Sequence, residues 1–411
     1  MDVTRFKDTK TGKFVPIRTA TGGDFAFIPD PLPPQWDFPT HLWPRLAEAK
    51  ERLGHLDGIG KTLPDPELLL SPLKNREALA SSRIEGTYAT AQELMLFEMS
   101  PHEPKSAHDQ ANAWLEVYNY SRALARGTKR LIELPFCGKL IKELHGILMD
   151  GVRGQHSKPG EWRDLQVAIG SDRRYIPPPK IEMLKCLEEL ERYINSIDNR
   201  YDPLVRSYIV HYQIEAIHPF ADGNGRVGRV VLSLMIAHWC RLSRPWLYMS
   251  AFFEKHKNEY VDNLFGVSTE GAWEKWVNFC IEGTIQQAND AIRRCEKLRK
   301  LREEMSDKLG THGSARTAQI IELLFSNPIV RVSHLRKLFD ISYPTAQSDI
   351  DKLIKYEILR PLPDVRPKAF YSPAVMAAAY EDIDPLNELN PPDSIAQPFS
   401  QNDRKGVIPE Y

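Results

Sequence analysis

The chain has 411 residues, of which 42% are hydrophobic and 27% are charged, an ordinary globular composition with room for two or three domains. Its formal net charge is −1, so any contact with nucleic acid would need a local basic patch. The five cysteines form no CxxC pair, which argues against a zinc site and a disulfide framework: Cys137, Cys186, Cys240, Cys280 and Cys295.

The first residues, MDVTRFKDTKTGKFV, lack the apolar core of a secretory signal. The longest apolar run, VVLSLMIAHWC at 230–240, is too short to cross a bilayer. We therefore expect a cytoplasmic protein with no membrane partner.

The N-terminal part is predicted to be a helical region at 1–110 that begins with a non-helical segment. Residues 1–45 read as extended or loop-like, because prolines crowd FIPDPLPPQWDFP and exclude a helix there. From about 40 to 125, apolar residues recur every three or four positions, which predicts helices. The block from about 137 to 285 is also largely helical. Its one clear strand signal is LQVAIGSDRRYIPPP at 165–179, which predicts a small β-hairpin.

The C-terminal part divides into a linker, a small module and a tail. A charged helix is predicted at 286–313, and Gly310 and Gly313 interrupt its pattern near the end. Residues 314–375 read as three helices followed by two short strands, the order of a winged helix-turn-helix. The tail at 376–411 is rich in Asp, Asn, Pro and Gln, which predicts a loosely ordered segment. The predicted fold class is therefore mainly α.

The stretch HPFADGNGRVGR, residues 218–229, joins two predicted helices. The first should end near His218 and the second should begin near Gly225, so the loop presents backbone N–H groups at a helix N-terminus. The glycines at 223 and 225 allow these groups to approach a phosphate closely. Arg226 and Arg229 are three residues apart on a helix and can face one ligand. The loop therefore predicts a polyphosphate site.

Two further residues of the stretch suggest a reaction. Asp222 would oppose anion binding unless it holds a Mg²⁺ ion that also contacts phosphate oxygens. A neutral imidazole at His218 can take a proton from a hydroxyl group at neutral pH. A helix cap, a turn or a solvated face would explain each residue alone, but within twelve residues all of them fit the same ligand. The prediction is hydroxyl attack on a nucleotide phosphate.

This stretch resembles the HPFx[DE]GNGRxxR signature of Fic-domain proteins at every signature position. The upstream segments LHGILMDGVRG, KPGEWRDLQVAIG and IPPP also resemble those that precede the motif in bacterial Fic proteins. The resemblance covers roughly residues 70–260. It implies a Fic-type helical core at 111–285 and transfer of AMP from ATP to a Ser, Thr or Tyr hydroxyl of a target protein, with pyrophosphate leaving.

The resemblance also implies a role for each matching position. His218 would be the general base, and Asp222 would carry Mg²⁺. Arg226 would bind the β-phosphate and Arg229 the γ-phosphate. The full set of implied nucleotide-binding residues, with one loosely matched aromatic on the adenine side, is Phe220, Ala221, Asp222, Gly223, Asn224, Gly225, Arg226, Arg229 and Tyr260. The predicted hairpin resembles the Fic flap, which pairs with the target by strand addition through Val167, Ile169, Gly170 and Tyr175.

A second motif lies upstream in LASSRIEGTYAT, residues 79–90. Ser81 and Glu85 would share one helical face, and Gly86 would end the helix. The plain interpretation is a surface helix with an ordinary C-cap. The pattern also resembles the [ST]xxxE[GN] inhibitory motif of Fic proteins whose inhibitory helix precedes the core. That resemblance predicts an inhibitory helix at about 74–86, with Glu85 opposing Arg229 in the space of the γ-phosphate. In some relatives this glutamate supports removal of AMP, so the reverse reaction is a further prediction.

Several alternatives stay open at this point. The predicted recognition helix at 344–357 mixes Lys352 and Lys355 with three acidic residues, so DNA binding competes with a protein–protein or packing role. A different class of function is a transcriptional regulator or toxin–antitoxin-like protein with a nucleotide-sensing Fic core. A homodimer is compatible with the architecture. The sequence does not name the target protein, the modified side chain or the signal that relieves inhibition.

Overall fold

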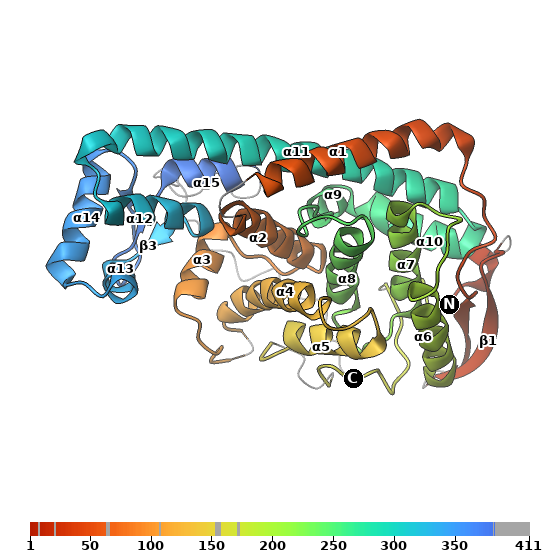
Figure 1. Cartoon of the computed structure of the whole chain (residues 1–411). Coiled ribbons are helices and arrows are strands. Elements are labelled where there is room, and N and C mark those ends of the chain that lie inside the picture. The colour runs from red at the N-terminus through yellow and green to blue at the C-terminus, as the bar shows by residue number, and fades with distance from the viewer. Residues whose placement is uncertain are drawn as a thin grey trace, which may run out of the picture.

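The computed structural model describes residues 1–6, 9–19, 22–62, 66–106, 108–152, 158–170, 173–380 and 382. Helices α1 (Trp43–Lys61) and α11 (Trp273–Leu309) contact each other along one long edge of the molecule (Figure 1). Helix α11 has 37 residues and is buried at intervals as far as Leu309. The boundary predicted between the Fic core and the linker, at 285/286, lies inside this uninterrupted helix.

The N-terminal segment, expected to be extended or loop-like, contains a β-hairpin that was not predicted. Strands β1 (Gly12–Thr19) and β2 (Gly22–Pro29) pair antiparallel, with Gly12 opposite Pro29. The proline cluster begins only at the end of β2 and therefore does not interrupt the ladder. Phe27 is fully buried, and its N–H donates to the carbonyl of Ile176 at 2.9 Å. The hairpin is thereby attached to the predicted flap.

The hairpin predicted at 165–179 is reduced to one bridge in the described residues. Ile169 and Tyr175 exchange backbone hydrogen bonds of 2.8 and 3.3 Å, without strands on either side. Residues 171 and 172, between them, lie outside the described part of the chain.

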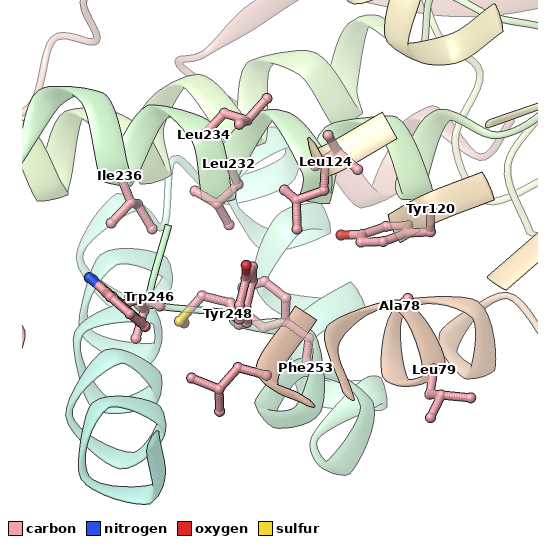
Figure 2. Close-up of a cluster of buried hydrophobic side chains, with 14 of the residues drawn as sticks. Ala78, Leu79, Tyr120, Leu124, Leu232, Leu234, Ile236, Trp246, Tyr248 and Phe253 are labelled. Atoms are coloured by element: carbon pink, nitrogen blue, oxygen red, sulfur yellow. The ribbon is translucent and has the colours of Figure 1, made fainter. Parts of the chain in front are cut away.

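The core lies where four helices meet: α2 (Glu67–Ile84), α4 (Ala111–Arg130), α8 (Asn224–Trp239) and α9 (Ser250–Lys255). Figure 2 shows Leu79 of α2, Tyr120 of α4 and Leu232 of α8 among the buried side chains of this cluster. Burial of several such side chains, each worth about 1.5–3 kcal/mol, fixes α2 against the helix that follows the motif. The surrounding helices are α3 (Ala91–Met99), α5 (Gly138–Leu148), α6 (Lys180–Ile194), α7 (Pro203–Ile217) and α10 (Lys257–Glu270).

The C-terminal module has its elements in the predicted order, and its classification as a winged helix stays a prediction. Its three short strands form an antiparallel sheet in the order β3-β5-β4. The elements are α12 (Ala315–Ser326), β3 (Ile329–Val330), α13 (Val332–Phe339), α14 (Tyr343–Lys355), β4 (Arg360–Pro361) and β5 (Phe370–Tyr371). Short 3-10 turns lie elsewhere, at Val3–Phe6, Thr40–Leu42 and Gly310–His312.

The start of the predicted tail is a packed helix, so the loose-order prediction for 376–411 was wrong at 376–380. Helix α15 (Pro373–Tyr380) contacts α11 and α2, and Tyr380 is fully buried. Its last carbonyls are bound by arginines: Ala379 O accepts from Arg76 at 3.1 Å and from Arg294 at 3.2 Å. The small apolar residues of this segment allow the close approach. Residues 381 and 383–411 lie outside the described residues.

Among the residues that the structure describes, no helix is both long and apolar enough to span a bilayer.

Candidate active site

His218 directly follows α7 and holds a left-handed backbone conformation, with φ of 50° and ψ of 62°. This conformation is costly for a residue other than glycine, and the surroundings hold it in place. The guanidinium of Arg163 donates to the His218 carbonyl at 2.8 Å, and the Arg163 N–H donates to the Pro219 carbonyl at 2.9 Å. The helix therefore ends where the sequence predicted, and the chain turns sharply into the loop.

The loop is closed on itself by Asn224. The Phe220 N–H donates to Asn224 Oδ1, and Asn224 Nδ2 donates to the Phe220 carbonyl, both at 2.8 Å. Phe220 is fully buried and stacks on the ring of His145 at 3.7 Å, so it packs in the core as predicted. The Asn224 side chain therefore shapes the loop through these two bonds.

His145 of α5 supports the loop, a role that the sequence did not reveal. Its Nδ1 accepts from the Gly160 N–H at 2.9 Å, so its Nε2 carries the proton that is donated to the Asp222 carbonyl at 2.9 Å. Burial lowers the pKa of His145 to about 4, which favours this neutral tautomer. His145 and Arg163 lie in the upstream segments that resemble Fic proteins, but neither position could be assigned without the fold.

The two glycines of the loop lie so close to neighbouring groups that a side chain at either position would clash. Gly223 precedes α8 with φ of 75°, and a Cβ there would lie 2.9 Å from Met149 Sδ. A Cβ on Gly225 would lie 2.3 Å from Glu85 Oε1 and 2.8 Å from Arg229 Nη1. A carboxylate therefore lies directly against the glycine-rich turn at the start of α8, which begins within one residue of the predicted position.

Glu85 and Ser81 meet Arg229 as the upstream motif predicted. Helix α2 ends at Ile84, Glu85 is its C-cap, and Gly86 follows with φ of 85°. Arg229, which is 2% exposed, donates to Glu85 Oε1 at 2.7 Å, to Ser81 Oγ at 2.8 Å and to the Ser81 carbonyl at 3.0 Å. Burial alone would raise the pKa of Glu85, but the Arg229 guanidinium outweighs it and holds that pKa below its usual value.

Arg226 does not share the partner of Arg229. Its Nη1 donates to Glu116 Oε2 of α4 at 3.0 Å, and its Nη2 lies 3.8 Å from Asp222 Oδ1. The sequence expectation was that both arginines face one ligand, whereas here each is held by a different carboxylate. Glu116 was not predicted, because it is 110 residues away from Arg226 and belongs to no local motif.

These groups surround a cavity of about 450 Å³. Glu85, His218, Gly225 and Arg229 form a polar wall, and Tyr260 of α10 belongs to a largely apolar one. Tyr260 is 3% exposed, stacks on Phe253 at 4.3 Å and shares a hydrogen bond of 2.9 Å with His211. The other lining residues are Ile169, Gly170, Arg174, Tyr175, Tyr212, Glu215, Ala216, Val261, Leu264, Phe265 and Ser268. The polar wall of such a cavity suits phosphate groups, and the apolar wall suits the flat ring of a nucleobase.

His218 is neutral at physiological pH. Burial is the largest cause, and the nearby Arg163 adds to it, together lowering the pKa of His218 to about 4. Its Nδ1 is buried and has no hydrogen-bond partner among the described residues. A neutral imidazole can accept a proton, and a triphosphate bound beside it would raise its pKa toward the range in which a general base works best.

Glu215, one turn before His218, is a second titratable group of the cavity that the sequence did not single out. Burial raises the pKa of its carboxyl group to about 7, although Arg229 acts in the opposite direction. Its side chain needs Gly228, where a Cβ would lie 2.3 Å from Glu215 Oε1.

The predicted flap residues have different environments. Ile169 and Gly170 line the cavity, and Val167 is half-buried. Tyr175 is buried, and its hydroxyl donates to the Ala216 carbonyl at 3.0 Å, which fixes this segment to α7. The Tyr175 side chain therefore anchors the segment, which lines the cavity at Ile169, Gly170 and Tyr175. Ala221, also in the predicted set, is half-buried in the loop.

Asp222 fits a magnesium ion that is bound mainly by phosphate. Its side chain is 56% exposed, and Oδ1 accepts from the Gly223 N–H at 2.6 Å. Among the described residues no cluster of three or more His, Cys, Asp or Glu side chains could form a cage for a metal ion. Mg²⁺ commonly takes one carboxylate together with phosphate oxygens and water, and this donor set is consistent with that pattern.

Two parts of the chain match known families. Residues 135–236 match the Fic/DOC family, and residues 43–129 match the N-terminal region of the Fic/DOC family. The segment at 135–236 is therefore similar to the domains of the Fic/DOC family. The loop at 218–229 and its partners on α5 lie in the first of these regions, whereas Glu85 and Glu116 lie in the second.

The chain has relatives among characterised proteins. The chain is 31% identical over 110 residues to the protein adenylyltransferase fic-1 of Caenorhabditis briggsae, covering 24% of this chain and 21% of that protein. It is 29% identical over 130 residues to the protein adenylyltransferase Fic of Aedes aegypti, covering 31% of this chain and 24% of that protein. The chain thus spans about a quarter of the length of these relatives or less.

The crystal structure of a Fic family protein from Desulfovibrio desulfuricans G20 has a similar fold. The TM-score is 0.53 at 20% sequence identity, and the match covers 83% of this chain and 98% of that one. The predicted fold class, a mainly helical Fic-type core, is therefore confirmed. Assignment to the bacterial class with an N-terminal inhibitory helix stays a prediction.

Proposed function

We propose that this Fic-domain protein transfers AMP from ATP to a Ser, Thr or Tyr hydroxyl of a target protein, and to itself. The observation that carries the proposal is the position of the Glu85 carboxylate. It lies against Gly225 and bonds to Arg229 at 2.7 Å. An anion therefore already occupies the space between Gly225 and Arg229 beside His218, which we call the cradle. The activities of the matched adenylyltransferases support the choice of AMP as the transferred group.

In the proposed reaction His218 removes the proton of the target hydroxyl. The hydroxyl oxygen forms a bond to the α-phosphorus, and the bond from that phosphorus to the bridging oxygen of the β-phosphate breaks. Pyrophosphate leaves with the electron pair. Backbone N–H groups at the start of α8 and the guanidinium of Arg229 stabilise the negative charge on the phosphates. Asp222 would hold Mg²⁺, which supplies further neutralisation of this charge.

The same contact gives the protein an autoinhibited form. Glu85 occupies the place that the γ-phosphate would need on Arg229, so ATP must displace it for a productive geometry. A charge-assisted bond of this kind is worth on the order of 1.5–3 kcal/mol, enough to slow the reaction about tenfold or more. Because Glu85 also lies beside His218 in the cavity, removal of AMP from a modified target is a second proposed activity.

The proposal is tested by incubating the wild type and Glu85→Gly with ATP and Mg²⁺ and measuring intact mass. We expect a mass gain of one AMP, formed about tenfold or more faster by Glu85→Gly. The control is Glu103→Gly, an exposed glutamate outside α2, which should label like the wild type. Equal rates for Glu85→Gly and the wild type would contradict autoinhibition. Absence of AMP from all variants and from added hydroxyl-bearing proteins would contradict the transferase.

The identity of the target, a homodimer, a cytoplasmic location and DNA binding by a winged helix remain predictions. So does the alternative function, a transcriptional regulator or toxin–antitoxin-like protein that senses nucleotides.

A further inference from the structure

The turn that follows Glu85 also reaches the second arginine of the loop. The Thr87 hydroxyl donates to Glu116 Oε2 at 2.7 Å, and the same oxygen accepts from Arg226 Nη1 at 3.0 Å. The segment 85–87 is therefore linked to both arginines, to Arg229 directly through Glu85 and to Arg226 through Glu116.

The Glu116 side chain, which accepts both bonds, is held in place by its surroundings. The side chains of Glu116 and Arg226 are only 9% and 6% exposed, so water screens their attraction weakly. One helical turn further along α4, the Tyr120 hydroxyl donates to Glu77 Oε1 of α2 at 2.8 Å, and both groups are buried. Helix α4 also packs against α2 and α8. Glu116 therefore sets where Arg226 lies relative to the loop.

The inhibitory turn itself is held by few bonds. After α2 ends, the N–H groups of Glu85 and Thr87 both donate to the Ser82 carbonyl, at 3.1 and 3.0 Å. Gly86, with φ of 85°, allows the reversal of direction. The Glu85 side chain is 39% exposed at the cavity, and it bonds to Arg229 there. Besides the Glu85–Arg229 bond, the Thr87 hydroxyl supplies a second side-chain contact that attaches this turn to the body of the domain.

We propose that Thr87 and Glu116 form a second link between the inhibitory turn and the phosphate-binding loop. Thr87 anchors the turn so that Glu85 stays directed at Arg229, and Glu116 is a positioning residue for Arg226. This inference rests on the proposed function. Rotation of the Glu85 side chain alone would leave the Thr87–Glu116 bond intact, whereas movement of the helix end would break it.

The anchor is tested with Thr87→Val, which removes the hydroxyl and keeps the shape, and Thr87→Ser, which keeps the hydroxyl. Loss of one hydrogen bond predicts a rise of about two- to tenfold in the rate of AMP transfer for Thr87→Val and no rise for Thr87→Ser. In the Glu85→Gly background Thr87→Val should have no further effect, because the group that it directs is absent. A rise of the same size in both backgrounds, or no rise in either, would overturn the anchor.

A readout without nucleotide separates this inference from the proposed function. Hydrogen exchange of the amides at 85–88 should be faster in Thr87→Val, while the interior of α2 at 73–80 is unchanged. If Glu85→Gly shows no gain in activity, autoinhibition fails, but the exchange experiment still tests the link. Unchanged exchange at 85–88 would contradict it.

The positioning role of Glu116 is tested by nucleotide binding in the Glu85→Gly background. Glu116→Gln keeps an acceptor for Thr87 and removes the charge that holds Arg226. ADP has the β-phosphate that Arg226 would contact, and AMP lacks it. We expect the Kd for ADP to rise about tenfold and the Kd for AMP to stay unchanged. Equal changes for both ligands, no change, or tighter binding of ADP would each overturn this role.

Discussion

The loop at 218–229 was predicted to bind the phosphates of a nucleotide, whereas DNA binding by helix α14 was one of several open alternatives. The two regions differ in structure. In the loop, Arg229 and Arg226 are buried and bond to carboxylates from α2 and α4. In α14, polar side chains bond to one another or to the module itself. Gln347 donates to Asp351 at 2.8 Å, and Lys352 donates to the His312 carbonyl at 3.2 Å.

The comparison indicates that an anion site needs polar groups from several helices at one point. A helix that merely contains basic residues does not provide this. Glu85 at the end of α2, residues of α7 and α10 and the start of α8 line one cavity. Helices α4 and α5 hold the loop through Glu116 and His145. Asp349 of α14 is also buried, but Arg316 of α12 binds it through two bonds, which makes it a packing contact within the module. The predictions below test this difference between the two regions.

The largest effect is expected from His218→Ala. Loss of a general base typically costs about 10²- to 10⁴-fold in rate, so AMP transfer should be almost abolished. ATP should still bind, because the cradle and both arginines remain. The measurement is labelling with radioactive ATP together with the thermal shift produced by ATP. Retained labelling would exclude His218 as the base.

A smaller effect is expected from Gly225→Ala in the Glu85→Gly background. With Glu85 truncated, the added methyl group still approaches Arg229 Nη1, where it would lie 2.8 Å away, and narrows the cradle. We expect KM for ATP to rise about tenfold, the scale of one lost charge-assisted bond. Gly54→Ala, at an exposed position of α1 with no heavy atom within 4 Å of the new Cβ, is the matched control. A KM for ATP equal to that of the control would contradict the proposal that the phosphates bind between Gly225 and Arg229.

The Fic core should lose stability in mild acid more than the C-terminal module. Burial, the largest cause for both, lowers the pKa of His145 to about 4 and that of His211 to about 3, below the usual 6.5. The unfolded chain therefore binds more protons below pH 6.5, and stability is full above that pH and falls toward pH 4. At pH 4.5 each histidine lowers the free energy of unfolding by about 2.5–3 kcal/mol relative to neutral pH. The carboxyl group of Glu215, with its pKa raised to about 7, acts in the opposite direction, as do those of Glu77, Glu98 and Asp30, whose pKa values burial also raises.

This pH dependence is measured by thermal unfolding and by hydrogen exchange of the two regions between pH 7 and 4.5. Residues 315–380 contain one histidine, His334, which is exposed, so the module should change less in this range. His145→Gln should reduce the pH dependence of the core. An identical loss of protection in both regions would contradict the assignment to buried histidines.

The smallest effect is expected for DNA. Because the polar side chains of α14 are largely paired within the module, we expect no gel shift of duplex DNA by the full chain at about 150 mM salt. Lys355→Ala should then change nothing. A shift that weakens as salt rises would revive the DNA-binding alternative and remove the contrast between the two regions.

The sequence predicted those parts of the site that are local. The end of α7 at His218, the start of α8 and the pairing of Glu85 with Arg229 all follow from two short motifs, the last through resemblance. Glu116, His145 and Arg163 could not be predicted, because each acts on the loop from a distant segment. The N-terminal hairpin was missed because the prolines that follow β2 dominated the interpretation of that segment. The continuity of α11 was missed because a change of composition near 285 was taken as a boundary.

Helix α2 contacts the C-terminal module as well as the loop at 218–229. Arg76 of α2 donates to Asp382 at 2.8 Å and to the carbonyl of Ala379 in α15 at 3.1 Å. Helix α12 packs against the same helix. At the other end of α2, about 12 Å further along the axis, the chain turns toward Arg229. Because both contacts lie on one helix, the packing of the C-terminal module and the position of Glu85 at Arg229 depend on the same element.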